Sequence, residues 1–276
     1  MDVQAVRGVI SDLDRAFVGD MQALPATTFQ QPSDCDGWTI GAAVIHLAQV
    51  AEMLGDSVMR GRAGDPGPPP LAATEGLLAW RAARTARQQL AMTQTPPELL
   101  AWYATATAAL SAALDGISSA TPGAQGWHPV GPRPLAWIQD QWLFELALHD
   151  WDIRVALDPN AEIRTEAQAT FARTLPDRLG RGFSGADDAA LAGTYRVEVQ
   201  GSEPLVVTIT VGSGAVDVVD AAAGGTPDVT VHTDPTAFGL VVTNRRPVEQ
   251  FQGAGRWEAS GDAAKADGFA RAFTSY

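Results

Sequence analysis

The sequence predicts an α+β protein, with a helical bundle in residues 1–182 followed by a small α+β domain in residues 183–276. Two changes of pattern predict this division. Up to about residue 180, apolar residues recur at intervals of three and four, as on the buried face of an amphipathic helix. From about residue 193, short segments rich in valine and threonine alternate apolar and polar side chains between glycine-containing turns, as β-strands do. A sequence whose helical patterns come first and whose strand patterns follow is typical of a protein with two domains.

The predicted helices of the bundle differ in how clearly they begin and end. Ser33, Asp34 and Asp36 offer capping oxygens before the second helix. Pro96 begins either a separate helix or the continuation of a kinked one. The expected helices cover residues 2–20, 38–59, 74–94, 96–114, 135–156 and 165–179. In the second domain, four strands are expected near residues 194–200, 204–211, 215–221 and 229–234, with a short helix after Pro235 and a last helix from Gly261.

The composition argues against several classes of partner. The chain of 276 residues is 46% hydrophobic, and it has no apolar run long enough to span a membrane. Its 19 basic and 32 acidic side chains give a net charge of −13, which disfavours binding to nucleic acid or to an anionic membrane surface. The single cysteine cannot form an internal disulfide, and the first residues lack the pattern of a secretory signal. We therefore expect a protein of the reducing cytoplasm.

The most informative stretch is the apolar helix over residues 135–156, which carries Glu145 and His149. A spacing of four places both side chains on one helical face, where they can hold one metal ion or form a solvated surface pair. A third candidate, His46, lies in the equally apolar second helix, where a histidine can also be a core residue. If the two helices pack side by side, the three residues converge. Two imidazoles and one carboxylate suit zinc, nickel or ferrous iron and leave coordination positions open.

These motifs resemble the DinB-like metal-binding bundles, and most closely the mycothiol-dependent maleylpyruvate isomerase family. The first motif precedes the helix of His46 and consists of Cys35, Gly37, Trp38 and Thr39. The second is the Glu145–His149 pair followed by Trp151, Asp152 and Ile153. Members of this family often carry a sterol-carrier-protein-like domain that ends in a Gly-Asp-Ala-Ala helix, which residues 261–264 match. One departure is the segment 41–43, Gly-Ala-Ala, where relatives often carry polar residues.

The resemblance implies a zinc ion, or another divalent metal, held by His46, Glu145 and His149. It also implies mycothiol as the thiol cofactor or co-substrate and a small-molecule electrophile as its partner. The reaction would be cis–trans isomerisation of a small unsaturated acid or S-transfer to the electrophile. Two alternatives stay open at this point. One is thiol-free, metal-dependent tailoring of a secondary metabolite, and the other is a non-enzymatic small-molecule carrier.

Other residues are weaker candidates for the site. Arg81 and Arg84 follow Trp80 and can clamp a carboxylate or form surface salt bridges. His128 lies in a Gly/Pro-rich loop and can reach the site or remain exposed. Arg245 and Arg246 of the second domain are candidates for holding a carboxylate of the thiol or substrate. Cys35 is expected to be a packed or partly exposed thiol, and Asp152 either orients a ligand histidine or caps local backbone.

Overall fold

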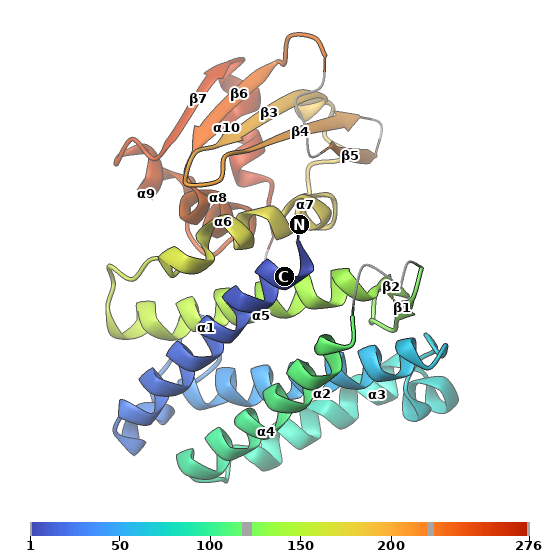
Figure 1. Cartoon of the computed structure of the whole chain (residues 1–276). Helices are drawn as coiled ribbons and strands as arrows, with labels where there is room; N and C mark the ends of the chain where they lie inside the picture. The colour runs from blue at the N-terminus through green and yellow to red at the C-terminus, as the bar shows by residue number, and fades with distance from the viewer. Residues whose placement is uncertain (1, 118–122, 213, 220–223, 275–276) are drawn as a thin grey trace. The chain divides into compact units, whose positions relative to one another are not determined.

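A computed structural model describes residues 2–117, 123–212, 214–219 and 224–274 (Figure 1). The contacts divide the chain into two compact units, Met1–Arg164 and Thr165–Tyr276. The first unit is helical, and the second combines a five-stranded sheet with helices. The predicted α+β class, a helical bundle followed by a small α+β domain, is confirmed.

Four helices form the core of the first unit: α1 (Val3–Ala23), α2 (Ile40–Arg62), α4 (Pro96–Asp115) and α5 (Leu135–Leu157). Helix α2 packs against α4 and α5, and α1 packs against the same two helices, so each core helix has two neighbours. Most residues of α2 and α5 are buried, so other parts of the chain cover most of the surface of these two helices. Such helices make a rigid support for side chains that point between them. No helix in the described ranges has the length and apolar character needed to cross a membrane.

Local capping explains where the core helices begin. The side chain of Asp2 accepts a hydrogen bond from Gln4 N and caps α1. Thr39, rather than the predicted Ser33, Asp34 or Asp36, caps α2, because its hydroxyl accepts a hydrogen bond from Ala42 N at 3.1 Å. A short 3₁₀ helix, Ala26–Gln30, connects α1 to this region. Two short paired segments, β1 (Gln125–Gly126) and β2 (Arg133–Pro134), precede α5.

Helix α3 (Pro70–Ala91) lies outside this core and contacts mainly α2. Ala91 is its only residue classed as buried. Gly76 interrupts the helix with φ 88° and ψ 168°, a conformation that almost only glycine adopts. A capping box formed by Thr95 and Glu98 starts α4 afresh, so α3 and α4 are two helices.

The second unit begins earlier than the predicted boundary at residue 182. The predicted helix over residues 165–179 is two helices, α6 (Thr165–Thr174) and α7 (Pro176–Gly182), because proline begins a new helix more readily than it continues one. Helix α6 packs on α8 (Pro235–Val242), and α7 packs on strand β5 (Ala215–Val219), so the contacts assign both to the second unit.

The sheet of the second unit has the strand order β5-β4-β3-β6-β7. Strands β3 and β6 are parallel, and the other neighbours are antiparallel. Buried residues alternate along β3 and β6, so one sheet face carries the core. The strands are β3 (Gly193–Val199), β4 (Leu205–Gly212), β5 (Ala215–Val219), β6 (Val229–Thr233) and β7 (Trp257–Gly261). The remaining helical elements are η2 (Ala189–Leu191), α9 (Val248–Gln252) and α10 (Ala263–Arg271).

Strand β7 is the element that the sequence pattern missed. Only Trp257 of its five residues is buried, because β7 is an edge strand whose other side chains are exposed. An exposed edge strand has no apolar alternation to reveal it.

Candidate metal centre

The three predicted ligands come together between α2 and α5. His46 reaches from α2, and its Nε2 lies 3.2 Å from Glu145 Oε2 on α5. One turn further along α5, His149 Nε2 lies 3.5 Å from the same oxygen. The ligand atoms of the three residues all lie within 4.8 Å of one another. The convergence expected from helix packing is therefore present in the structure.

These distances fit a tetrahedral metal ion. Zinc bonds to nitrogen and oxygen at about 2.0–2.1 Å, so two ligand atoms of one tetrahedral ion lie about 3.3 Å apart. The separations from Glu145 Oε2 to the two imidazoles, 3.2 and 3.5 Å, bracket that value. Gln141 Nε2 donates a hydrogen bond of 2.7 Å to the other oxygen, Oε1, and thereby fixes the carboxylate with Oε2 toward the histidines. The donor set consequently suits zinc in chemistry and in spacing.

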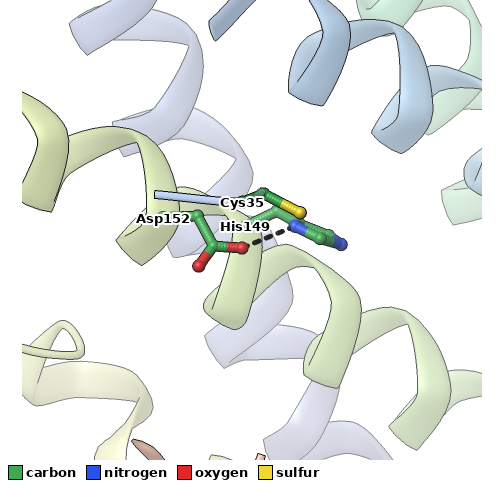
Figure 2. A group of neighbouring side chains, drawn as sticks. All are labelled: Cys35, His149 and Asp152. Carbon is green, nitrogen blue, oxygen red and sulfur yellow. Dashed lines mark hydrogen bonds and ion pairs between the residues drawn. The ribbon is translucent and has the colours of Figure 1, made fainter. Parts of the chain in front are cut away.

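Asp152 orients His149 from the side opposite Glu145. Its Oδ2 lies 2.8 Å from His149 Nδ1, and the Asp152 side chain is fully buried (Figure 2). A carboxylate at this position favours a proton on Nδ1 and leaves the lone pair of Nε2 for a metal. This contact is the one expected if Asp152 orients His149, and its role at a metal stays a prediction.

Cys35 lies beside this pair. Its sulfur, a His149 ring nitrogen and an Asp152 oxygen all lie within 4.8 Å of one another (Figure 2). The backbone of the preceding loop holds it there, since Asp34 N donates to Asp152 O at 2.9 Å. Gly37 allows the loop to turn with φ 75°. Cys35 is half-buried, which agrees with the predicted packed or partly exposed thiol.

Trp38 covers both imidazoles. Its ring centroid lies 4.8 Å from that of His46 and 5.7 Å from that of His149, where the two rings are stacked. The two imidazoles themselves meet edge to face at 4.7 Å. These contacts restrict rotation of the rings and replace water on one side of the centre.

The charges at the centre depend on one another. Burial lowers the pKa of His46, against the opposing effect of Glu145. Burial also lowers the pKa of His149, but hydrogen bonds to Asp152 and Glu145 outweigh it and raise the pKa to about 9. For Glu145, burial raises the pKa, while the hydrogen bonds to the two histidines bring it well below its ordinary value. Two buried carboxylates facing two imidazoles thus require positive charge, which protons or a divalent cation can supply.

The small residues 41–43, noted in the sequence as unusual for the resemblance, have a packing explanation. All three small residues are buried at the start of α2. A Cβ on Gly41 would lie 3.0 Å from the Phe29 backbone oxygen, so a larger residue would displace the 3₁₀ helix before α2.

The weaker candidates for the site differ in how they lie relative to the three predicted ligands. Arg81 is exposed on α3, while Arg84 is half-buried and interacts electrostatically with Glu145. The His128 ring contacts Trp137 at 5.0 Å and belongs to neither group of possible metal ligands found among the described residues. Arg245 and Arg246 follow α8 in the second unit, where both backbone N–H groups donate to Leu240 O. As anion-binding residues, Arg245 and Arg246 stay predictions.

Two glutamines escaped the sequence reasoning. Gln141 stands four residues before Glu145, and Gln49 stands three residues after His46. Both are buried polar residues on the faces that carry the ligands. A polar residue one turn from a ligand in an otherwise apolar helix is the signal that could have revealed them.

Comparisons with known proteins identify the family and the fold of the chain. The mycothiol maleylpyruvate isomerase N-terminal domain matches residues 10–154, and the SCP-2 sterol transfer family matches residues 184–274. A crystal structure of the mycothiol-dependent maleylpyruvate isomerase aligns with a TM-score of 0.63 at 15% identity, covering 95% of each chain. A mutant of the isomerase aligns with a TM-score of 0.62, again at 15% identity and 95% coverage of each chain. A search of curated proteins found no match.

The two family matches account for most of both structural units. Helices α6 and α7 both lie between the two matched ranges. The structural alignments extend over the bundle and the α+β unit together, and at this level of identity they show a shared fold. The resemblance predicted from the two motifs is confirmed: the chain belongs to the mycothiol maleylpyruvate isomerase N-terminal domain family, with an SCP-2-type domain after the helical bundle.

Proposed function

We propose that this protein is a zinc-dependent enzyme that uses a low-molecular-weight thiol, mycothiol or a close relative, against a small electrophile. The reaction is either cis–trans isomerisation of a small unsaturated acid or transfer of the sulfur to the electrophile. The observation that carries the proposal is the Glu145 carboxylate placed 3.2 and 3.5 Å from two imidazole nitrogens. Three protein ligands leave one tetrahedral position for a reactant.

The surrounding residues have distinct roles in this proposal. His46, Glu145 and His149 would hold the zinc ion. When bound, that ion would lower the pKa of a thiol and keep it as the nucleophilic thiolate. Asp152 and Gln141 fix the orientations of His149 and Glu145, so the ligand atoms need little rearrangement. Trp38 excludes water from the imidazole side.

The second unit has a supporting role in the proposal. Its match to the SCP-2 sterol transfer family suggests binding of a small molecule, and Arg245 and Arg246 are the basic residues proposed to hold a carboxylate of the thiol or substrate. Replacing both by glutamine is expected to raise KM for one of the two reactants. An unchanged KM for both would reject this role.

Metal analysis and turnover together test the proposal. We expect about one zinc ion per purified chain after dialysis against a weak chelator. Small unsaturated acids and other electrophiles are then incubated with and without mycothiol, and loss of the acid and formation of an isomer or thioether are followed by chromatography. Turnover that needs the thiol supports the proposal. Turnover without thiol would instead favour metal-dependent tailoring chemistry, and ligand binding by a metal-free chain would favour a carrier.

A further inference from the structure

Arg84 brings a guanidinium group from α3 to the side of α2 that carries His46. Two hydrogen bonds fix its position: Arg84 Nη1 donates to Gln49 O at 3.0 Å, and Gln49 Nε2 donates to Arg84 O at 3.1 Å. Gln49 lies one helical turn from His46, on the same face of α2. The backbone and side chain of Arg84 are therefore both tied to the helix that supplies a predicted metal ligand.

The guanidinium retains most of its hydrogen-bonding capacity. It lies 4.9 Å from the ring centroid of Trp80, and Trp80 in turn meets Trp127 edge to face at 5.1 Å. Stacking on an aromatic ring occupies a face of the guanidinium but leaves the N–H groups at its edge available. Among the described residues, Gln49 O is the only hydrogen-bond acceptor recorded for these N–H groups. A planar set of free N–H groups matches a carboxylate.

The local charge also favours an anion. Burial lowers the pKa of Arg84, opposed by the charges of Glu145 and Glu52, yet an arginine remains protonated at neutral pH. The neighbouring Arg87 forms a two-point ion pair with Glu52, so Arg87 is already neutralised. With a divalent cation bound, Glu145 and Asp152 would balance that ion and leave the charge of Arg84 in excess. This positive charge would stand out on a chain of net charge −13.

We propose that Arg84 is a specificity-determining residue that binds the carboxylate of the small acid taken as substrate under the proposed function. This inference rests on the proposed function, because it places the acid beside the predicted metal centre. A carboxylate held by Arg84 would keep the rest of a small acid on the side of α2 that carries His46 and Gln49. Orientation of this kind lowers the entropic barrier to attack by a bound thiol.

Binding of a simple dicarboxylate tests the inference without thiol or turnover. Isothermal titration calorimetry compares maleate with maleamide, its neutral diamide, on full-length variants of equal metal content. We expect Arg84→Gln to weaken maleate binding by at least about tenfold, since charge-assisted bidentate bonds are among the stronger hydrogen bonds. Maleamide binding should stay within about twofold of the wild type. Arg84→Lys should restore part of the maleate affinity, because it keeps the charge and loses the planar fork.

Two further variants separate anion binding from attachment of α3. Arg87→Gln removes the ion pair with Glu52 but keeps both hydrogen bonds between Arg84 and Gln49, so maleate affinity should stay close to that of the wild type. Equal losses in Arg87→Gln and Arg84→Gln would show that Arg84 acts only as a structural tether and would overturn the inference. A loss in Arg81→Gln rather than Arg84→Gln would also overturn it. A chain without thiol-dependent turnover that still bound maleate through Arg84 would reject the proposed reaction alone.

Discussion

Two carboxylates inside the helical bundle, Glu145 and Asp14, meet different surroundings. Glu145 lies between the imidazoles of α2 and α5, which keep its pKa well below the ordinary value despite burial. Asp14 lies on α1, beside a groove between α1 and α4, and accepts a hydrogen bond of 2.5 Å from the Tyr103 hydroxyl. Burial raises the pKa of Asp14 to about 6, although Tyr103 and Trp142 oppose the shift.

The difference shows what makes a buried carboxylate ready to bind a cation. Neutral hydrogen-bond donors compensate only part of the cost of removing a charge from water, so the proton is retained to a higher pH. Groups that can carry or coordinate positive charge keep the carboxylate ionised. Burial among aromatic residues is common to both sites, and the partners decide which carboxylate can serve as a ligand.

The largest effect is expected from removing a ligand. His46→Ala, Glu145→Ala and His149→Ala should each weaken zinc binding by more than about 100-fold, beyond the loss typical of outer-sphere partners. The helical circular dichroism should remain, because the bundle core extends well beyond the centre. Metal content by elemental analysis and competition with a chelator provide the measurement.

His128→Ala is the matched control, since His128 contacts Trp137 outside the centre. If all three ligand variants retained the metal, Glu145 would not be a metal ligand. The contrast between Glu145 as a cation-binding carboxylate and Asp14 as a protonated one would then be wrong. Unfolding of all three variants would instead indicate a structural metal.

An intermediate effect is expected from Asp152→Asn. The amide can still accept a hydrogen bond from His149 Nδ1, but it lacks the negative charge that strengthens the imidazole as a ligand. We expect zinc affinity to fall by about 10–100-fold, while the secondary structure is unchanged. Asp36→Asn in the exposed part of the preceding loop should have no effect on affinity. Equal zinc affinity in Asp152→Asn and the wild type would contradict the role of Asp152.

A third effect, on stability rather than on metal binding, concerns the pH dependence at Asp14. The folded-state pKa of about 6 exceeds the ordinary value of 3.8, so Asp14 stabilises the fold fully below pH 3.8 and loses that contribution as the pH rises through about 6. Asp14→Asn should therefore gain stability relative to the wild type, by about 2 kcal/mol, between about pH 4 and 7. Urea unfolding followed by tryptophan fluorescence measures this difference.

Asp12→Asn on the exposed side of α1 serves as the comparison for that experiment. Its stability should follow the wild type at each pH. A constant difference between Asp14→Asn and the wild type over the whole range would mean that burial does not hold the proton on Asp14.

The sequence was sufficient for the three converging residues because their signals were local. Two of them lie one turn apart on one helix, and the third lies on another strongly apolar helix. The side-chain contacts around these three residues were harder to predict. The hydrogen bond between Arg84 and Gln49, for example, joins residues that are 35 positions apart and lie on two different helices. Strand β7 was missed for a similar reason, because the burial of an edge strand depends on which surface covers it.

Helix α3 has a kinetic consequence. Its attachment to α2 rests on polar contacts at Gln49 and Glu52 and on one buried alanine, whereas α2 and α5 are embedded in the apolar core. Separation of α3 would expose little apolar surface, so its free-energy cost is small compared with that of opening the core. We expect amide hydrogen exchange in α3 to be faster than in α2 and α5.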